Sequence, residues 1–336
     1  MPELRRDPAK GKWVIIAVER SSRPSDFKLE VEEPAGPEKC PFDGGKEDQT
    51  PPEITAIRPE GSNLNTPGWT VRVVPNKFPA LKIEGEIESR GNGVYDAMNG
   101  VGAHEIIIET PDHFAAFETL KLDHASKIIW MFRERYLDLR KDQRLKYILI
   151  FKNKGRRAGA SLEHSHSQLI ATPIMPDLVK IELEAALTYY RYRGRCVYCD
   201  IISQEINEGK RLIFENDDFI AITPYASIVP FEIQIMPKQH SSDFGDIRLA
   251  EMNSLTKALQ SSLKMLAKAV PHVSYNFYLH TSPLENLTIP HYHWHIEIVP
   301  RLTHIAGFEW GSGLYINPVP PENAAKFLLE AKEVQE

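Results

Sequence analysis

The chain has 336 residues, 42% hydrophobic and 26% charged, with a formal net charge of −6 at pH 7. This composition is typical of a soluble globular protein long enough for two domains, and the acidic balance argues against a nucleic-acid binder. No apolar run approaches the roughly 20 residues that span a membrane, and charges interrupt residues 1–16, so the sequence predicts neither a membrane span nor a signal peptide. We therefore expect a cytoplasmic protein.

Apolar spacing in the first half predicts strands and one helix. Strands are expected at residues 69–75, 104–109 and 146–151, a helix at 123–142, a loop at 152–163 and a further strand from 164 to about 172. The second half repeats this order, with strands at 219–223, 231–236, 274–279 and 291–299 and a helix at 249–270. We expect an α+β fold of two tandem domains, residues 1–182 and 196–336, each an antiparallel sheet with helices packed on one face.

A histidine cassette occurs once in each half. The first reads His164-Ser165-His166-Ser167-Gln168, and the second reads His291-Tyr292-His293-Trp294-His295. His113 and His240 each precede their cassette by 51 residues. Such a repeat indicates two copies of one structural unit.

Side chains alternate between the faces of a strand, so the histidines of each cassette share one face with Gln168 or Glu297. A solvated sheet face is the alternative interpretation. Polar residues in strict register in two matching contexts favour a functional surface instead.

Cysteines and histidines predict two metal sites, for which zinc is the expected ion. Cys196, Cys199, His240 and His291 form a Cys₂His₂ set of the type that binds tetrahedral zinc. The first half offers Cys40, Asp43, His113 and His164, in which a carboxylate replaces one thiolate, and we expect this site to be weaker. The alternative is free cysteines with unrelated histidines, since three cysteines cannot form a disulfide framework.

The loop before the first cassette, Lys152 to Ser161, contains two glycines and four basic residues. Glycines permit a close approach of the backbone to a ligand, and the cations would attract phosphates. A solvated hairpin loop is the alternative. A neutral histidine beside such a loop is suited to attack phosphorus.

These motifs resemble the galactose-1-phosphate uridylyltransferase family of the histidine-triad superfamily. The resemblance rests on Arg5 to Pro24, on Val74 to Leu81, and on Phe151 through Gly155, Gly159 and Ser161 to Gln168. The second cassette with Val299-Pro300-Arg301 is a full histidine-triad pattern.

The resemblance implies a ping-pong reaction in which His166 takes UMP from UDP-glucose and passes it to galactose 1-phosphate. It implies catalytic roles for His166, Gln168 and Ser161, and a homodimer that binds a nucleotide sugar and a hexose 1-phosphate. The substrate-binding residues that we expect are Asn76, Asn153, Gly159, Ser161, Gln168, Tyr315 and Asn317.

Two segments depart from that family's usual pattern. Leu162-Glu163 stands where typical uridylyltransferases have Asn-Pro, and Gly313 to Pro318 replaces the segment that reads hexose hydroxyls. Both changes also resemble the ADP-glucose phosphorylase branch, in which phosphate accepts an adenylyl group. Two other functions stay open: a zinc-stabilised binding module, and a triad-type nucleotide hydrolase that uses His293.

Overall fold

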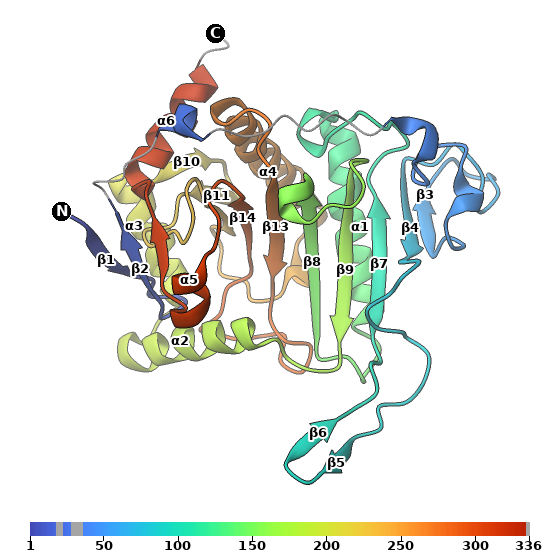
Figure 1. The fold of residues 1–336 in the computed structure, drawn as a ribbon, viewed down its shortest axis with the longest axis horizontal. Coiled ribbons are helices and arrows are strands. Elements are labelled where there is room, and N and C mark those ends of the chain that lie inside the picture. Colours follow the sequence, from blue (N-terminus) through green and yellow to red (C-terminus); the bar gives the residue numbers. More distant parts are fainter. Residues whose placement is uncertain (18–22, 28–35, 334–336) are drawn as a thin grey trace.

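A computed structural model describes residues 1–17, 23–27 and 36–333 (Figure 1). Its centre is a ten-stranded antiparallel sheet in the order β10-β11-β12-β14-β13-β8-β9-β7-β4-β3. The first half of the chain contributes β3 (Thr55–Ile57), β4 (Val71–Pro75), β7 (Ala103–Ile108), β8 (Tyr147–Lys154) and β9 (His166–Thr172). The second half contributes β10 (Leu212–Glu215), β11 (Phe219–Ile222), β12 (Ile233–Pro237), β13 (Tyr275–His280) and β14 (His295–Pro300).

The two halves of the sheet meet where β8 pairs with β13. Asn153 lies opposite Asn276 in this antiparallel pair, and Phe151 lies opposite Tyr278. One hydrophobic core contains buried residues of both halves. The repeated units therefore form one continuous sheet.

Helices α1 (Leu122–Leu139), α4 (Leu249–Ala269) and α6 (Pro321–Glu333) are amphipathic, with apolar residues at helical spacing. Helices α1 and α4 pack on one face of the large sheet (Figure 1), where Phe132 of α1 meets Phe277 of β13 at 6.4 Å between ring centroids. The predicted α+β class, with antiparallel strands and helices packed on one face, is confirmed.

Smaller elements surround this core. Strands β1 (Glu3–Arg6), β2 (Trp13–Ile16) and β15 (Tyr315–Asn317) form a second sheet, and β5 (Arg90–Asn92) and β6 (Tyr95–Ala97) form a hairpin that projects from the body (Figure 1). The remaining α-helices are α2 (Asp177–Arg193), α3 (Val197–Glu208) and α5 (Gly307–Ser312). Short 3₁₀ turns lie at Pro24–Asp26, Pro37–Lys39, Glu47–Gln49, Phe117–Thr119, Arg156–Ala158 and Phe244–Asp246.

Both cassette strands begin later than their histidine pattern predicts. Strand β9 starts at His166 and β14 starts at His295, so His164 and the segment His291 to Trp294 lie in the chain that leads into each strand. Each strand starts where pairing with its neighbour starts, at Ile108 for His166 and at His280 for His295. Within the described ranges, none of the helices combines the length and apolar character that a membrane span requires.

Candidate functional site

His166 lies at the start of β9, between β7 and β8, and its residue is only 5% exposed. The ring donates its Nδ1–H to the backbone oxygen of His164 at 2.7 Å. Burial lowers the pKa of His166 to about 4, so the ring is neutral at pH 7. A neutral ring with its proton on Nδ1 carries its lone pair on Nε2, which is the state that a histidine nucleophile needs.

Gln168 lies two residues along the strand, on the same face as His166. The backbone N–H of Ala80 donates to His104 Nδ1 at 3.1 Å, so the ring proton is on Nε2. His104 Nε2 then donates to Gln168 Oε1 at 2.9 Å, which leaves the NH₂ group of Gln168 to donate to an anion. Asn76 lies beside this pair, with its Nδ2 at 3.0 Å from His104 Nε2. His104 is a site residue that we did not predict, although it begins a predicted strand.

The glycine loop follows β8 on the same side of the sheet. Gly155 and Gly159 have φ of 81° and 86°, a region that favours glycine. A cavity of about 110 Å³ lies between this loop and the first predicted metal site. It is lined by Gly36, Lys39, Cys40, His113, Gly155, Arg156, Ala160, Ser161, Leu162 and Glu163. Ser161 and the loop therefore lie beside the predicted metal ligands Cys40 and His113.

Two predicted sugar-binding residues lie elsewhere. Asn317 is fully buried, and its side chain donates to the backbone oxygens of Ser227 and Val229 at 3.0 and 3.1 Å. Tyr315 pairs with Val14 and lines a cavity of about 80 Å³ between the N-terminal segment, where Lys10 lies, and residues of both halves. The prediction for Asn317 is wrong, because its hydrogen-bonding groups already hold a turn, and Tyr315 faces a different cavity from the one that Ser161 and the glycine loop line.

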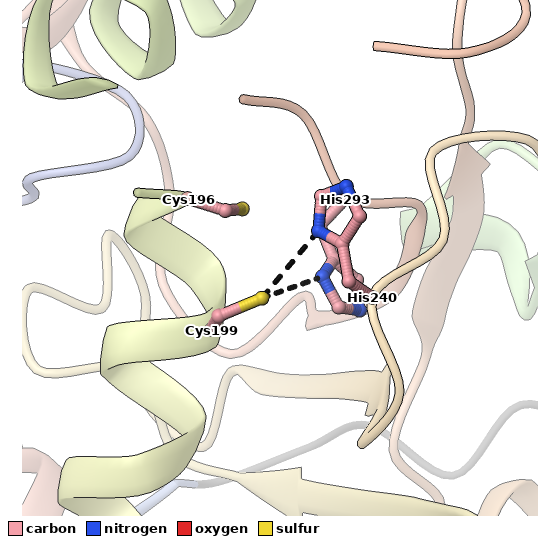
Figure 2. A group of neighbouring side chains, drawn as sticks. All are labelled: Cys196, Cys199, His240 and His293. Atoms are coloured by element: carbon pink, nitrogen blue, oxygen red, sulfur yellow. Dashed lines mark hydrogen bonds between the residues drawn. The ribbon is translucent and has the colours of Figure 1, made fainter. Parts of the chain in front are cut away.

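At the second predicted metal site, Cys196, Cys199 and His240 lie together with His293 (Figure 2). Cys199 Sγ lies 3.4 Å from His240 Nδ1 and 3.8 Å from His293 Nδ1. Two ligands on one tetrahedral zinc ion are separated by roughly 3.6 Å, so these separations fit such an ion. His293 Nε2 donates to the backbone oxygen of Pro237 at 2.8 Å, which leaves the Nδ1 lone pair facing the thiols.

The fourth member of this group is His293, which corrects our prediction of His291. A shift of two residues keeps a side chain on the same face of a strand, so alternation could not separate the two. The backbone oxygen of Pro237 accepts from His293 Nε2, and Cys199 Sγ lies next to His293 Nδ1. Because both nitrogens are engaged, His293 does not suit the role of nucleophile in a triad-type hydrolase.

The first predicted metal site, Cys40, Asp43, His113 and His164, is also brought together. Asp43 Oδ1 lies 2.8 Å from His113 Nδ1 and 2.9 Å from His164 Nδ1. His164 Nε2 donates to the backbone oxygen of Thr110 at 2.7 Å, so a neutral ring turns a lone pair toward the carboxylate. Two acceptors in contact require a proton or a cation between them, and this donor set therefore fits a metal ion.

Equivalent hydrogen bonds show which residues of the two halves correspond. His295 Nδ1 donates to the backbone oxygen of His293 at 3.0 Å, as His166 does to that of His164. His295 is therefore the counterpart of His166, and Glu297 is the counterpart of Gln168. However, His295 is fully buried and stacks on Tyr198 with 5.1 Å between ring centroids.

His295 belongs to a third group of possible metal ligands, with Glu182 and His280. His280 Nδ1 lies 2.9 Å from Glu182 Oε2, and all three residues are buried. Glu297 also pairs with Lys10 from the N-terminal segment. We did not predict this group, because Lys10 and Glu182 come from segments far from either cassette and carry no motif of their own.

Comparisons with known proteins agree with this geometry. Residues 1–176 match the model of the galactose-1-phosphate uridyl transferase N-terminal domain, and residues 101–335 match a domain of unknown function. ADP-glucose phosphorylase of Arabidopsis thaliana is 36% identical over 98% of this chain and 93% of its own length. Galactose-1-phosphate uridylyltransferase of Thermotoga maritima is 29% identical over 99% of each chain.

Solved structures agree as well. The Arabidopsis thaliana ADP-glucose phosphorylase with bound ADP-glucose superposes with a TM-score of 0.82 at 32% identity, over 98% of both chains. A uridylyltransferase structure gives 0.76 at 28% identity over the full length of both. The chain is therefore a nucleotidyltransferase that belongs to the galactose-1-phosphate uridylyltransferase family.

Proposed function

We propose that the chain moves a nucleotidyl group from a nucleotide sugar to a phosphate-bearing acceptor through a covalent nucleotidyl-His166. The observation that carries this proposal is the hydrogen bond from His166 Nδ1 to the backbone oxygen of His164. It places the lone pair on Nε2. In the first step Nε2 attacks the α-phosphorus, a P–N bond forms, and the bond to the bridging oxygen breaks to release the sugar 1-phosphate.

The acceptor completes the reaction in the second step. An oxygen of the acceptor phosphate attacks the same phosphorus, and the P–N bond breaks to return the lone pair to His166. The NH₂ group of Gln168 and the hydroxyl of Ser161 would donate to the non-bridging oxygens, where charge increases in both steps. Asn153 and Gly159 would line the phosphate position, and Asn76 the nucleoside position.

The first candidate takes ADP-glucose as donor and inorganic phosphate as acceptor, which the similarity to an ADP-glucose phosphorylase supports. The Arabidopsis phosphorylase is 36% identical, against 29% for the Thermotoga uridylyltransferase. The phosphorylase structure superposes with a TM-score of 0.82, against 0.76 for a uridylyltransferase structure. Leu162-Glu163 and the burial of Asn317 also depart from a site that reads hexose hydroxyls. Transfer of UMP from UDP-glucose to galactose 1-phosphate is the second candidate, which the family model supports.

We also propose a role for each half of the chain. The unit of residues 1–182 would carry the reaction, and the unit of residues 196–336 would support it. Zinc would be held tightly by Cys196, Cys199, His240 and His293, and more weakly by the group that contains Asp43. The active form would be a homodimer, which analytical ultracentrifugation tests.

Intact-protein mass spectrometry tests the function directly. The protein is incubated with ADP-glucose or UDP-glucose alone, and the mass of an acid-labile adduct identifies the base that it accepts. The preloaded protein is then given phosphate, glucose 1-phosphate or galactose 1-phosphate. We expect an adenylyl adduct that phosphate discharges fastest, and no adduct in His166→Asn. An adduct that persists in His166→Asn would overturn the mechanism, and faster discharge by a hexose 1-phosphate would favour the second candidate.

A further inference from the structure

We propose that Asn276 and Arg301, both in the second half of the chain, are positioning residues that turn the NH₂ group of Asn153 toward the reacting phosphate. This inference rests on the proposed function. It gives the second copy of the repeat a role in the reaction, although the counterpart of the nucleophile there is buried.

These residues lie in one row across the sheet. Asn153 of β8 lies directly opposite Asn276 of β13. On its other side, β8 pairs with β9, with Phe151 opposite Gln168, and the same register brings Asn153 across from His166. Residues opposite each other in an antiparallel pair share a face. The amide of Asn153 is therefore between the proposed nucleophile and Asn276.

The orientation of the Asn276 amide is set at both ends. Its Oδ1 accepts from Arg301 Nε at 2.6 Å, and a guanidinium is only a donor. Its Nδ2 donates to the backbone oxygen of Ala158 at 2.8 Å, and a carbonyl is only an acceptor. A flipped Asn276 would place two donors together at one end and two acceptors at the other. Asn276 is also only 8% exposed, so water is poorly placed to replace either partner.

This orientation determines that of Asn153. Asn276 Nδ2 also donates to Asn153 Oδ1 at 2.7 Å, which occupies the oxygen of Asn153. The NH₂ group of Asn153 then points away from Asn276, and a Cβ added to Gly159 would lie 3.9 Å from it. Asn153 is thereby held as a donor toward the glycine loop, where an anion would lie.

The hydrogen bonds from Arg301 to Asn276 and from Asn276 to Asn153 form a relay. Close packing also fixes the position of the glycine loop relative to this relay. A Cβ on Gly155 would lie 2.1 Å from Ser274 Oγ, so the loop backbone contacts β13 directly. Ser274 in turn accepts a hydrogen bond from the backbone of Arg301 at 2.8 Å. One segment of the second half thus holds both the loop and the amide.

A double-mutant cycle distinguishes orientation of Asn153 from general support of the loop. In Asn276→Asp, the carboxylate accepts from Arg301 and also from the NH₂ of Asn153, which turns the oxygen of Asn153 toward the phosphate. We expect the single-turnover rate of adduct formation to fall about 100-fold, as for the loss of an oxyanion donor. In an Asn153→Ala background, the same substitution should cost less than about threefold, because the residue through which it acts is gone.

Failure of this inference and failure of the proposed function give different results. An equal loss in both backgrounds would show that Asn276 acts through the loop, and would overturn the inference. Wild type without any adduct would contradict the proposed function, and the inference with it. Asn323→Asp, on the exposed surface of α6, is the matched control and should form the adduct at the wild-type rate. If Asn276→Asp does not fold, Arg301→Met in the same cycle gives the same test, and Arg301→Lys should retain most of the rate.

Discussion

His164 and His293 hold the same position in the two halves of the molecule. Each donates its Nε2–H to a backbone oxygen, that of Thr110 at 2.7 Å and that of Pro237 at 2.8 Å. Each turns Nδ1 toward a side chain of metal-ligand type, Asp43 or Cys199. A carbonyl that fixes the outer nitrogen of a histidine is a common support for a metal ligand.

The choice between His293 and His291 can be tested by metal content. His293→Ala should lose most of the zinc of the second site and lower the melting temperature, because bound metal stabilises the folded state. His291→Ala is the matched control, two residues away and outside the group, and should keep wild-type zinc. Inductively coupled plasma mass spectrometry of both variants after dialysis measures the difference. Equal zinc loss in the two variants would contradict our assignment.

The first metal site should become tighter if the missing thiolate is supplied. Asp43→Cys would give the group the ligand set Cys₂His₂, and thiolates bind zinc more strongly than one carboxylate oxygen. We expect at least about tenfold slower loss of this zinc to a chelator, followed with a colorimetric zinc indicator. Asp48→Cys, on a nearby exposed turn, controls for the added thiol. An unchanged rate would mean that Asp43 is not a ligand.

Substitution of the two loop glycines by alanine should lower the free energy of unfolding by different amounts. Gly155 has φ 81° and ψ 156°, a region almost restricted to glycine, and an added Cβ would meet Ser274 Oγ at 2.1 Å. Gly155→Ala should cost about 3 kcal/mol or more in the free energy of unfolding, since strain and overpacking combine. Gly159→Ala has ordinary space around it and should cost only about 1–2 kcal/mol.

Urea denaturation followed by circular dichroism measures both variants. Ser274→Gly should recover part of the Gly155→Ala loss, because it removes the oxygen that the new methyl would meet. If both variants lose the same free energy, the contact with Ser274 is not what restricts Gly155.

Local spacing was enough to predict several parts of this molecule. The helices predicted at 123–142 and 249–270 correspond to α1 and α4, because apolar periodicity is a local property of the chain. The four residues Cys40, Asp43, His113 and His164 lie together, as the sequence spacing suggests, and metal binding by them stays a prediction. The choice of His291 was wrong, because the true offset between the cassettes, from His164 to His293, is 129 residues, two more than the offset between His113 and His240.

Long-range pairing could not be predicted from the same patterns. The contact of β8 with β13 joins segments more than 100 residues apart, and it creates the relay from Arg301 to Asn153. Lys10 pairs with Glu297 across an even longer separation. Such contacts depend on how complete elements pack, and single residues in the sequence carry no periodic signal for them.

A buried ion pair beneath the cassette gives a pH prediction. Glu109 accepts hydrogen bonds from Lys152 Nζ at 2.7 Å and from Ser165 and Ser167, each at 2.6 Å. Burial alone would raise the pKa of Glu109, but the charge of Lys152 and these hydrogen bonds outweigh it and lower the pKa below its ordinary value of 4.5. The stability that this carboxylate contributes is therefore fully present above pH 4.5 and is lost as the pH falls through the lowered pKa.

Lys152→Met should reverse this dependence. Without its partner, the buried carboxylate of Glu109 has a raised pKa, so its charged form destabilises the protein as the pH rises. We expect a loss of about 3–5 kcal/mol at pH 7, a smaller loss near pH 4, and recovery of most of it in Lys152→Met with Glu109→Gln. Urea denaturation at pH 4, 5 and 7 measures these differences, with Lys257→Met on the exposed side of α4 as control. The same loss at every pH would mean that packing of the Lys152 stem, and not its charge on Glu109, supports the strand beneath His166.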